Sequence, residues 1–146
     1  MKLINFAVVF LLLFTSSYAQ NAKTAKNEIN TLINSFSSAV DSRNSEALEP
    51  LLNENFRVIA NRFPTDDKTT VLTKETYITF LKAGKIGGEK RKLKIKWIDV
   101  TNHIASAKIV FESDKTVFTT YQSFILNPNN VWQLISDMPF LKKNQK

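Results

Sequence analysis

The stretch from Glu89 to Phe111, EKRKLKIKWIDVTNHIASAKIVF, decides the fold because its apolar and polar residues alternate. A period of two residues sends successive side chains to opposite faces of a β-strand. The apolar positions are Leu93, Ile95 and Trp97 in the first half, and Ala105, Ala107, Ile109 and Phe111 in the second half. The stretch therefore predicts two strands with one apolar face each, joined by a loop at residues 101–103.

We expect these two strands to form an antiparallel hairpin in which apolar residues face each other. The predicted pairs are Leu93 with Phe111, Ile95 with Ile109, and Trp97 with Ala107. A slip by one residue would instead place Lys108 opposite Trp97. Asp99 continues the apolar series at the end of the first strand, so its carboxyl is expected to face inward, while the intervening lysines face away from the helices.

The chain before this stretch carries the longer period of amphipathic helices. Apolar residues in the segment 24–42 recur at the i, i+4, i+7 and i+8 positions of one helix face. Asn44 is placed to cap a second, shorter helix, and Thr73 is placed to cap a third, which Gly84 ends. A strand at 56–63 and a turn-rich loop, PTDDKTT, separate the second and third helices.

Two further runs, 117–126 and 131–137, are joined by a turn, Asn127-Pro-Asn-Asn130, and bring the run of antiparallel strands to four. Their alternation is mixed, so both faces of this second hairpin are expected to be covered. One predicted face carries Tyr121, Ile125, Trp132 and Leu134. The other carries Phe118, Phe124, Leu126 and Ile135, and we expect it to lie on the side of the sheet away from the helices.

Helices followed by antiparallel strands are typical of an α+β domain with the helices on one side of a curved sheet. The leading segment AKNEINTLINSFSSAVDSRNSEALEPLL, the strand NFRVIA and the closing strand NVWQLISDM resemble the nuclear-transport-factor-two-like superfamily, which includes ketosteroid isomerase, SnoaL-like cyclases and lumazine-binding-like proteins. The resemblance covers nearly all of residues 24–140. It implies a cone-shaped α+β fold, with about three N-terminal helices on a strongly curved, mostly antiparallel sheet, and it implies no single activity.

The first twenty residues have the layout of a secretory signal peptide. Lys2 precedes a nine-residue apolar run, Phe6–Phe14, and Ser17-Tyr-Ala19 supplies a small-residue exit. A bilayer span needs about 20 apolar residues, so we expect cleavage after Ala19 and no stable membrane insertion. Residues 20–146 would then form one exported domain, periplasmic or secreted, whose formal net charge falls from +7 to +6 with the loss of Lys2.

Five basic residues lie between Lys90 and Lys96. We interpret them as a solvated strand face, because long charged side chains also discourage edge-to-edge pairing of sheets. We expect no nucleic-acid partner, since the lysines are not interleaved with exposed aromatic residues. An acidic polysaccharide, an anionic membrane surface and a partner protein are the alternatives for so basic a surface.

The composition excludes several kinds of catalytic and metal site. The chain has no cysteine and one histidine, His103, so it cannot build Cys-His catalysis or the usual zinc sites. The glycines of AGKIGGEK lack the Lys-Ser/Thr pair and the following helix of a phosphate-binding loop. We therefore expect neither a metal nor a cofactor.

The leading hypothesis of function is non-enzymatic binding of a small, mostly apolar ligand in a cone between the helices and the sheet. The aromatic residues expected to contact this ligand are Phe36, Tyr77, Trp97, Tyr121 and Trp132. The motive is a fold with a natural cavity and no complete catalytic set in the sequence.

Two alternatives stay open. An isomerase, dehydratase or cyclase would use Asp99 as its acid or base, with Tyr121 or Tyr77 as a hydrogen-bond donor. This reading requires the Asp99 carboxyl to be buried. The third hypothesis is an interaction protein, a homodimer that pairs one apolar sheet face with its copy. The expected interface residues are Phe118, Phe124, Leu126 and Ile135.

Overall fold

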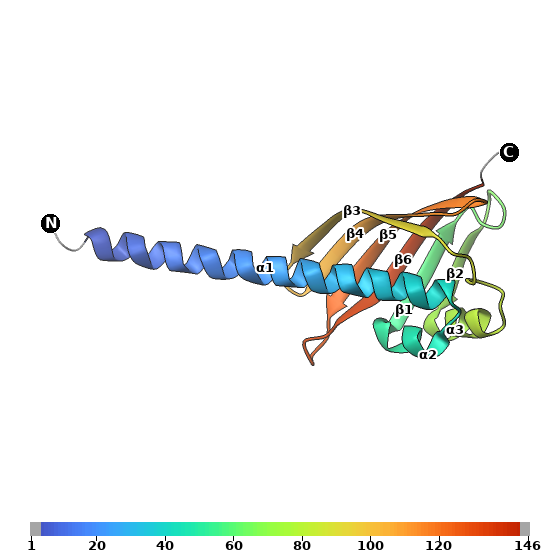
Figure 1. The fold of residues 1–146 in the computed structure, drawn as a ribbon, viewed down its shortest axis with the longest axis horizontal. Coiled ribbons are helices and arrows are strands. Elements are labelled where there is room, and N and C mark those ends of the chain that lie inside the picture. The colour runs from blue at the N-terminus through green and yellow to red at the C-terminus, as the bar shows by residue number, and fades with distance from the viewer. Residues whose placement is uncertain (1–3, 144–146) are drawn as a thin grey trace.

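The structure, a computed structural model, describes the backbone of residues 4–143 and the side chains of residues 21–142. Its elements are α1 (Ile4–Asp41), α2 (Ser45–Leu48), the 3-10 turn η1 (Glu49–Leu51), β1 (Leu52–Asn61), β2 (Thr69–Thr73), α3 (Lys74–Lys82), β3 (Lys92–Thr101), β4 (Ile104–Glu112), β5 (Thr116–Leu126) and β6 (Trp132–Lys143). Helices cover one face of a curved sheet (Figure 1), so the α+β prediction is confirmed.

The sheet has six strands in the order β2-β1-β6-β5-β4-β3. All neighbours are antiparallel except β1 and β6, which run parallel. Residues 69–73 form β2, where the sequence predicted a loop over 64–70 and no strand, because this segment pairs along β1 from Asn61 to Arg57. The predicted four-strand run is therefore the larger part of a six-stranded mixed sheet.

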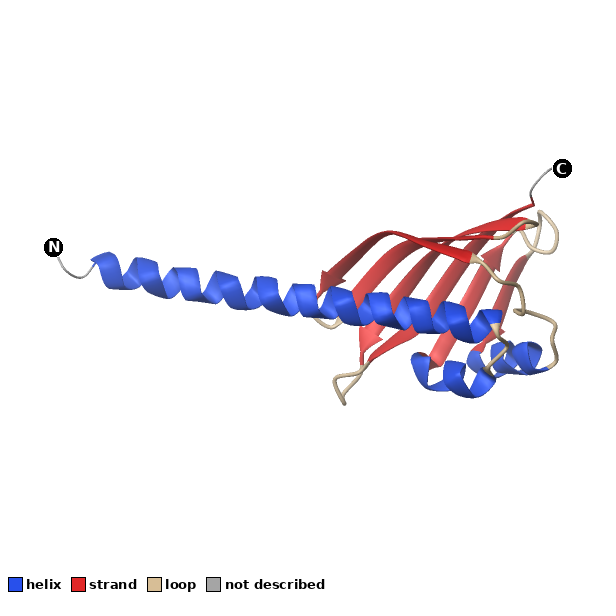
Figure 2. Cartoon of the chain, in the orientation of Figure 1, coloured by secondary structure: helices blue, strands red, loops and turns tan. Residues whose placement is uncertain are grey.

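The C-terminal half of α1 lies across the concave face of the sheet, and its N-terminal half extends beyond the sheet edge (Figures 1 and 2). Its apolar stripe is buried against the strands and joins the core at Ile29, Leu32, Ile33, Phe36 and Val40. The predicted cleavage site after Ala19 falls within α1, and the side chains around it lie outside the described residues. In the described part of the chain, no helix is long and apolar enough to span a membrane.

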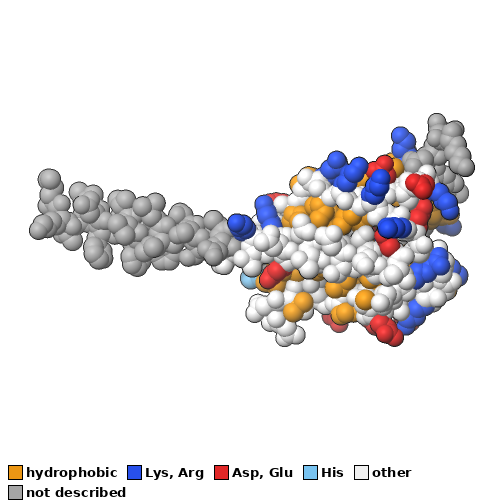
Figure 3. All heavy atoms as spheres, in the orientation of Figure 1, with side chains coloured by type: hydrophobic (Ala, Val, Ile, Leu, Met, Phe, Trp, Pro, Cys, Tyr) orange, Lys and Arg blue, Asp and Glu red, His pale blue; other side chains and the backbone are white. Residues whose placement is uncertain are grey.

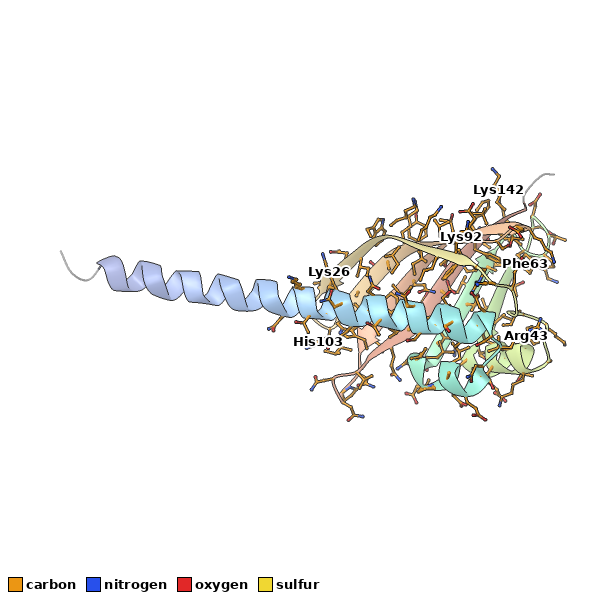
Figure 4. All side chains as sticks on the ribbon, in the orientation of Figure 1. Lys26, Arg43, Phe63, Lys92, His103 and Lys142 are labelled. Carbon is orange, nitrogen blue, oxygen red and sulfur yellow. The ribbon has the colours of Figure 1, made fainter. Side chains whose placement is uncertain are left out.

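The end of α1 is fixed by a backbone turn and by one side chain. Arg43 adopts a left-handed conformation (φ 55°), and the Asn44 N–H reaches back to the Ala39 carbonyl, 2.8 Å away, as in a Schellman cap. The Arg43 guanidinium donates hydrogen bonds to the carbonyls of Gly84, Ile86 and Gly87 at 3.1–3.3 Å. Arg43 therefore ties the loop before β3 to the end of α1 (Figure 4).

The predicted helix caps are confirmed. The Asn44 side chain accepts a hydrogen bond from the Ala47 N–H at the start of α2, and the Thr73 hydroxyl accepts one from the Thr76 N–H at the start of α3. These bonds satisfy N–H groups that have no partner inside the helix. Gly84 follows the last residues of α3 with a positive φ of 70°.

A bulge in β3 changes which residues of that strand face the core. The predicted pairs Leu93 with Phe111 and Ile95 with Ile109 are confirmed, but the register then shifts by one residue at Lys96. Trp97 lies opposite Lys108, and Ile98 takes the place opposite Ala107 that Trp97 was predicted to hold. The hairpin turn is one residue shorter than predicted, and the bulge absorbs the difference.

A second bulge lies in β6 at Ile135. Ser123 of β5 pairs with Ser136, and the next pair along is Phe124 with Leu134, so Ile135 is left over between them. The bulge reverses the alternation that starts at Trp132 and turns Asp137 inward, where the side chain is 7% exposed. Bulges also strengthen the twist of the strands they interrupt, which helps the sheet to curve around α1.

Alanine substitutions at Gly84 and Gly87 test how tightly the loop before β3 packs on the end of α1. A Cβ on Gly87 would lie 2.3 Å from the Val40 carbonyl oxygen, whereas a Cβ on Gly84 would meet only the Arg43 side chain at 3.6 Å. Both glycines have a positive φ, so both alanine variants share that strain of about 1–2 kcal/mol. Chemical unfolding should show Gly87→Ala to be destabilised by at least about 1 kcal/mol more than Gly84→Ala. Equal losses would mean that the loop moves away from α1 without cost.

Candidate functional site: a buried polar cluster inside the cone

Three polar side chains lie on the inner face of β5 and β6. Thr120 and Gln122 lie four and two residues before the buried Phe124 and therefore share its inner face. Asp137 points inward because of the bulge at Ile135. All three are buried in a core that is mostly apolar. Polar side chains in such surroundings are costly unless each finds a partner, so the cluster requires an explanation.

Asp137 is the buried acid of this cluster. The Thr120 hydroxyl donates a hydrogen bond to its Oδ1. Burial raises the pKa of Asp137 from 3.8 to about 6, and the Thr120 hydrogen bond, the Gln122 side chain and the Arg91 charge oppose this rise only in part. Removal from water disfavours the carboxylate form. Asp137 can therefore hold or release a proton near neutral pH.

Gln122 lies opposite Asp137 in the strand pairing and is fully buried, with 0% exposure. Its amide lies near enough to favour the Asp137 carboxylate, but among the described residues neither amide atom has a hydrogen-bond partner of good geometry. An unsatisfied buried donor or acceptor costs about 1–3 kcal/mol. Gln122 thus presents a buried donor and acceptor that make no well-formed hydrogen bond to another described residue.

Tyr77 enters the cone from α3. Its ring stacks on Phe36 of α1 with a centroid distance of 6.5 Å, and it meets the edge of Phe56 of β1 at 5.6 Å. Burial, assisted by the charge on Asp137, raises the pKa of the Tyr77 hydroxyl. Tyr77 therefore stays protonated, and its hydroxyl is a hydrogen-bond donor close to the carboxyl.

Arg91 and Asp41 form an ion pair where α1 ends and β3 is about to begin. The Arg91 Nη2 and Nε atoms each lie 2.6 Å from Asp41 Oδ1, and both side chains are mostly buried. The Arg91 guanidinium also lies over the Phe111 ring, 4.5 Å from its centroid. The Arg91 charge lies near enough to Asp137 to lower its pKa. The ion pair also ties the loop before β3 to α1.

The structure corrects two of the five predicted ligand contacts and the predicted acid. Phe36, Tyr77 and Trp132 are buried inside, as predicted. Trp97 and Tyr121 lie on the outer face, 43% and 48% exposed. Asp99 is exposed on that same face, so the prediction that its carboxyl faces inward is wrong, and the acid/base argument for Asp99 and Tyr121 loses its basis.

The predicted interface face is also wrong. Phe124 is 1% exposed, and Phe118 and Leu126 pack against the core, so these side chains belong to the inner face. Ile135 is the bulged residue of β6 and is half-buried. Because Tyr121 and Ile125 take the outer face instead, the homodimer stays a prediction without the surface that was assigned to it.

Sequence reasoning missed Thr120, Gln122 and Asp137, although the sequence carries a signal for each bulge. In β3 the adjacent apolar pair Trp97-Ile98 breaks the alternation, and in β6 the pair Leu134-Ile135 does the same. Two apolar neighbours within an alternating run are typical of a residue inserted into a strand. Allowing a one-residue register shift at both places would have predicted that Asp99 faces outward and Asp137 inward.

Two surface hollows lie outside the cone. One is lined by Glu49, Glu54, Lys74, Glu75, Ile78, Thr79 and Lys82, beside α3. The other is lined by Ser35, Ser38, Ala39, Ser42, Asn44, Ala47 and Leu51, between α1 and α2. Neither is lined by a residue of the buried cluster. The described residues contain no group of three or more His, Cys, Asp or Glu side chains placed to hold a metal ion.

The overall arrangement of helices on one face of a curved sheet recurs in solved structures. An NTF2-like protein of unknown function from Shewanella baltica superimposes with a TM-score of 0.72 at 15% identity, over 83% of this chain and 96% of that one. The chain has the NTF2-like fold. An NTF2-like protein from Cytophaga hutchinsonii gives a TM-score of 0.69 at 18% identity, over 80% and 98% of the two chains.

A ketosteroid isomerase-like protein from Erwinia carotovora atroseptica also shares the NTF2-like fold, with a TM-score of 0.65 at 11% identity over 82% of this chain and 96% of that one. No protein-family model matches the sequence, and no curated protein matches it. At these identities the likeness establishes the fold alone. The predicted resemblance to this superfamily is confirmed at that level.

The buried acid predicts a pH dependence of stability. The folded-state pKa of Asp137 is about 6 against an ordinary value of 3.8, so its contribution to stability is complete below about pH 4 and is lost as the pH rises through 6. A shift of about two units corresponds to roughly 3 kcal/mol. Relative to the unmodified chain, Asp137→Asn should gain about that much unfolding free energy between pH 4 and pH 8.

Denaturant unfolding at several pH values measures this difference in unfolding free energy. Titrating groups that both proteins share contribute equally to each and cancel in the difference. Asp99→Asn is the matched control, because it removes an exposed carboxyl from the opposite face of the sheet. Because Asp137 is intact in this variant, it should keep the loss of stability that the unmodified chain shows between pH 4 and pH 8. If the Asp137→Asn difference does not change with pH, the carboxyl is not desolvated as the structure places it.

Proposed function

We propose that the protein binds a small, mostly apolar molecule inside the cone, with a polar group of the ligand anchored at Gln122 and Asp137. The observation that carries the proposal is the Gln122 amide, which is fully buried and whose two polar atoms make no hydrogen bond of good geometry to any described residue. Buried amides in folded proteins are almost always satisfied. A bound molecule with a hydroxyl, carbonyl or carboxyl group would supply the missing partners.

The surroundings of the cluster suit an apolar ligand body. Phe36, Phe56 and Trp132 are buried around the same interior, and Tyr77 contacts the first two of them. Such aromatic walls with a few convergent polar groups are typical of small-molecule sites. Ligand specificity would come from the donors Tyr77 and Gln122 and from the titratable Asp137.

Entry of the ligand requires side chains at one end of the cone to move, because the two surface hollows do not reach the cluster. Phe118, Leu93 and Ile86 are only partly buried where they pack on the core. They belong to the end of the molecule that carries Lys92 and Lys142, opposite the hairpin with His103 (Figure 4). We place the entrance at this end.

A second candidate function is proton transfer at the same site, with Asp137 in the role first assigned to Asp99. Two observations favour it: the pKa of Asp137 rises to about 6, and the protonated Tyr77 hydroxyl lies within electrostatic range. An acid or base works best when its pKa lies near the working pH. One structural neighbour is named a ketosteroid isomerase-like protein. Loss of turnover with retained binding in Asp137→Asn would separate catalysis from simple binding.

We also propose that the domain is exported and that residues 1–19 are removed, from the signal-peptide layout of the sequence. The intact mass of the protein recovered outside the cytoplasm should correspond to a chain that starts at Gln20. Replacement of Ala19 by a large charged residue, Ala19→Arg, should block this processing. Recovery of the full-length chain from the cytoplasm alone would contradict export.

The binding proposal predicts that replacing glutamine by leucine stabilises the chain at position 122 and destabilises it at position 133. Gln122→Leu keeps the side-chain volume and removes an unpartnered amide, so the ligand-free chain should gain about 1–3 kcal/mol of unfolding free energy. Gln133→Leu is the control, because the Gln133 side chain accepts from Asn53 at 3.1 Å and donates to the Pro50 carbonyl at 3.3 Å. That variant should lose stability.

A thermal-shift screen of small apolar compounds bearing a ketone, hydroxyl or carboxyl group tests the binding itself. Compounds that raise the melting temperature of the unmodified chain should have no effect on Gln122→Leu and should still act on Gln133→Leu. The proposal fails if Gln122→Leu destabilises the chain as Gln133→Leu does, since the amide would then have a partner. It also fails if no compound stabilises the unmodified chain.

A further inference from the structure

The outer face of the sheet, away from the helices, carries exposed aromatic residues in a single cross-strand row. Trp97 of β3 pairs with Lys108 of β4, Lys108 pairs with Tyr121 of β5, and Tyr121 pairs with Met138 of β6. Trp97, Tyr121 and Met138 are all exposed large apolar side chains. We call this row, with the lysines beside it, the outer platform.

The two rings of the outer platform are in contact. The Trp97 and Tyr121 centroids lie 6.2 Å apart with the rings tilted by 54°, and the Lys108 Nζ lies 5.4 Å from the centre of the Tyr121 ring. An ammonium group over an aromatic ring is attracted by it and restricts its orientation. The platform is therefore an ordered apolar surface that remains open to solvent.

Positive charge surrounds these rings. Lys92, Lys94 and Lys96 are exposed along β3, and Figure 3 shows Lys and Arg side chains gathered along that edge of the molecule. Two carboxylates lie among them. Glu112 forms an ion pair with Lys94 at 3.0 Å, and Asp99 lies on β3 two residues beyond Trp97. The face thus combines apolar rings, an excess of cations and hydrogen-bond acceptors.

We propose that the outer platform binds an acidic polysaccharide. The apolar C–H face of a sugar ring packs against an aromatic ring, as other apolar surfaces do. The carboxylate or sulfate groups of the polymer pair with Lys108 and the β3 lysines. Sugar hydroxyls donate hydrogen bonds to Asp99 and to Ser106 and Ser123, which share a cross-strand row with it.

The charge pattern favours this occupant over a second copy of the chain. A two-fold dimer through the outer platform would bury the lysine-rich surfaces of both copies in one interface. Like charges brought together in an interface repel each other and weaken the association of two copies. A polymer of opposite sign instead turns the same lysines into favourable contacts.

The pattern also favours a polysaccharide over a nucleic acid. A nucleic acid carries a phosphate at every nucleotide, so its dense negative charge would be repelled by Asp99 and Glu112 within the platform. A polysaccharide carries its acidic groups among many hydroxyls, which these carboxylates can accept hydrogen bonds from. The exposure of Trp97 removes one sequence argument against a nucleic acid, so that polymer is included in the test.

Calorimetric titration of the full chain with polygalacturonate tests the proposal, and fully methyl-esterified polygalacturonate is the uncharged probe. Binding of the acidic polymer should weaken with salt, and the methyl ester should bind at least about tenfold more weakly. Trp97→Ala and Lys108→Gln should each weaken binding about tenfold. Circular dichroism should show both variants folded, because both side chains are on the surface.

Two substitutions away from the outer platform are matched controls. Phe63→Ala removes an aromatic ring that is 47% exposed in the loop after β1, and Lys82→Gln removes an exposed charge from α3. Both should bind within about twofold of the unmodified chain. The proposal is overturned if the controls weaken binding as Trp97→Ala does, or if the chain does not bind polygalacturonate.

Two other results would assign the outer platform to a different ligand. Tighter binding of poly(U) than of polygalacturonate, lost in Trp97→Ala, would assign the face to a single-stranded nucleic acid. Sedimentation of the unmodified chain as a dimer that Trp97→Ala dissociates would assign it to a second copy. Either result contradicts the polysaccharide proposal.

Discussion

The apolar stripe of α1 must be kept from water, and the rest of the fold depends on how the sheet covers it. A flat sheet would meet a cylinder along a line, so six strands must bend to enclose Ile29, Ile33 and Phe36. The bulges at Lys96 in β3 and at Ile135 in β6 interrupt the regular ladder and increase the local twist. The cone is therefore a consequence of covering one helix with one sheet.

The same two bulges decide which carboxyl is buried. Each one moves the residues beyond it to the opposite face, so Asp99 leaves the core and Asp137 enters it. Trp97 leaves with Asp99 and joins Tyr121 on the outside. One geometric device thus creates both a polar cluster in an apolar interior and an aromatic surface that faces solvent.

A polar cluster of this kind works against the stability of the fold. The charged form of Asp137 is disfavoured by burial, and the Gln122 amide makes no well-formed hydrogen bond within the part of the chain that the structure describes. A packed apolar residue at either position would satisfy the core better. Stability alone does not account for these side chains, which is why we propose that they bind a ligand. The Arg91–Asp41 ion pair and the Arg43 hydrogen bonds hold the surrounding loop on α1.

The sequence by itself determined the α+β class, the helix caps at Asn44 and Thr73, the hairpin between β3 and β4, and the resemblance to NTF2-like proteins. These features follow from local periodicity and from hydrogen bonds between residues close in the chain. The short edge strand β2, the inward position of Asp137 and Gln122, and the exposure of Trp97 were decided by the tertiary structure. Strict alternation cannot reveal them, because the face of each strand residue depends on where the pairing with the neighbouring strand slips by one residue. These slips lie at Lys96 and Ile135, and only the assembled sheet shows them.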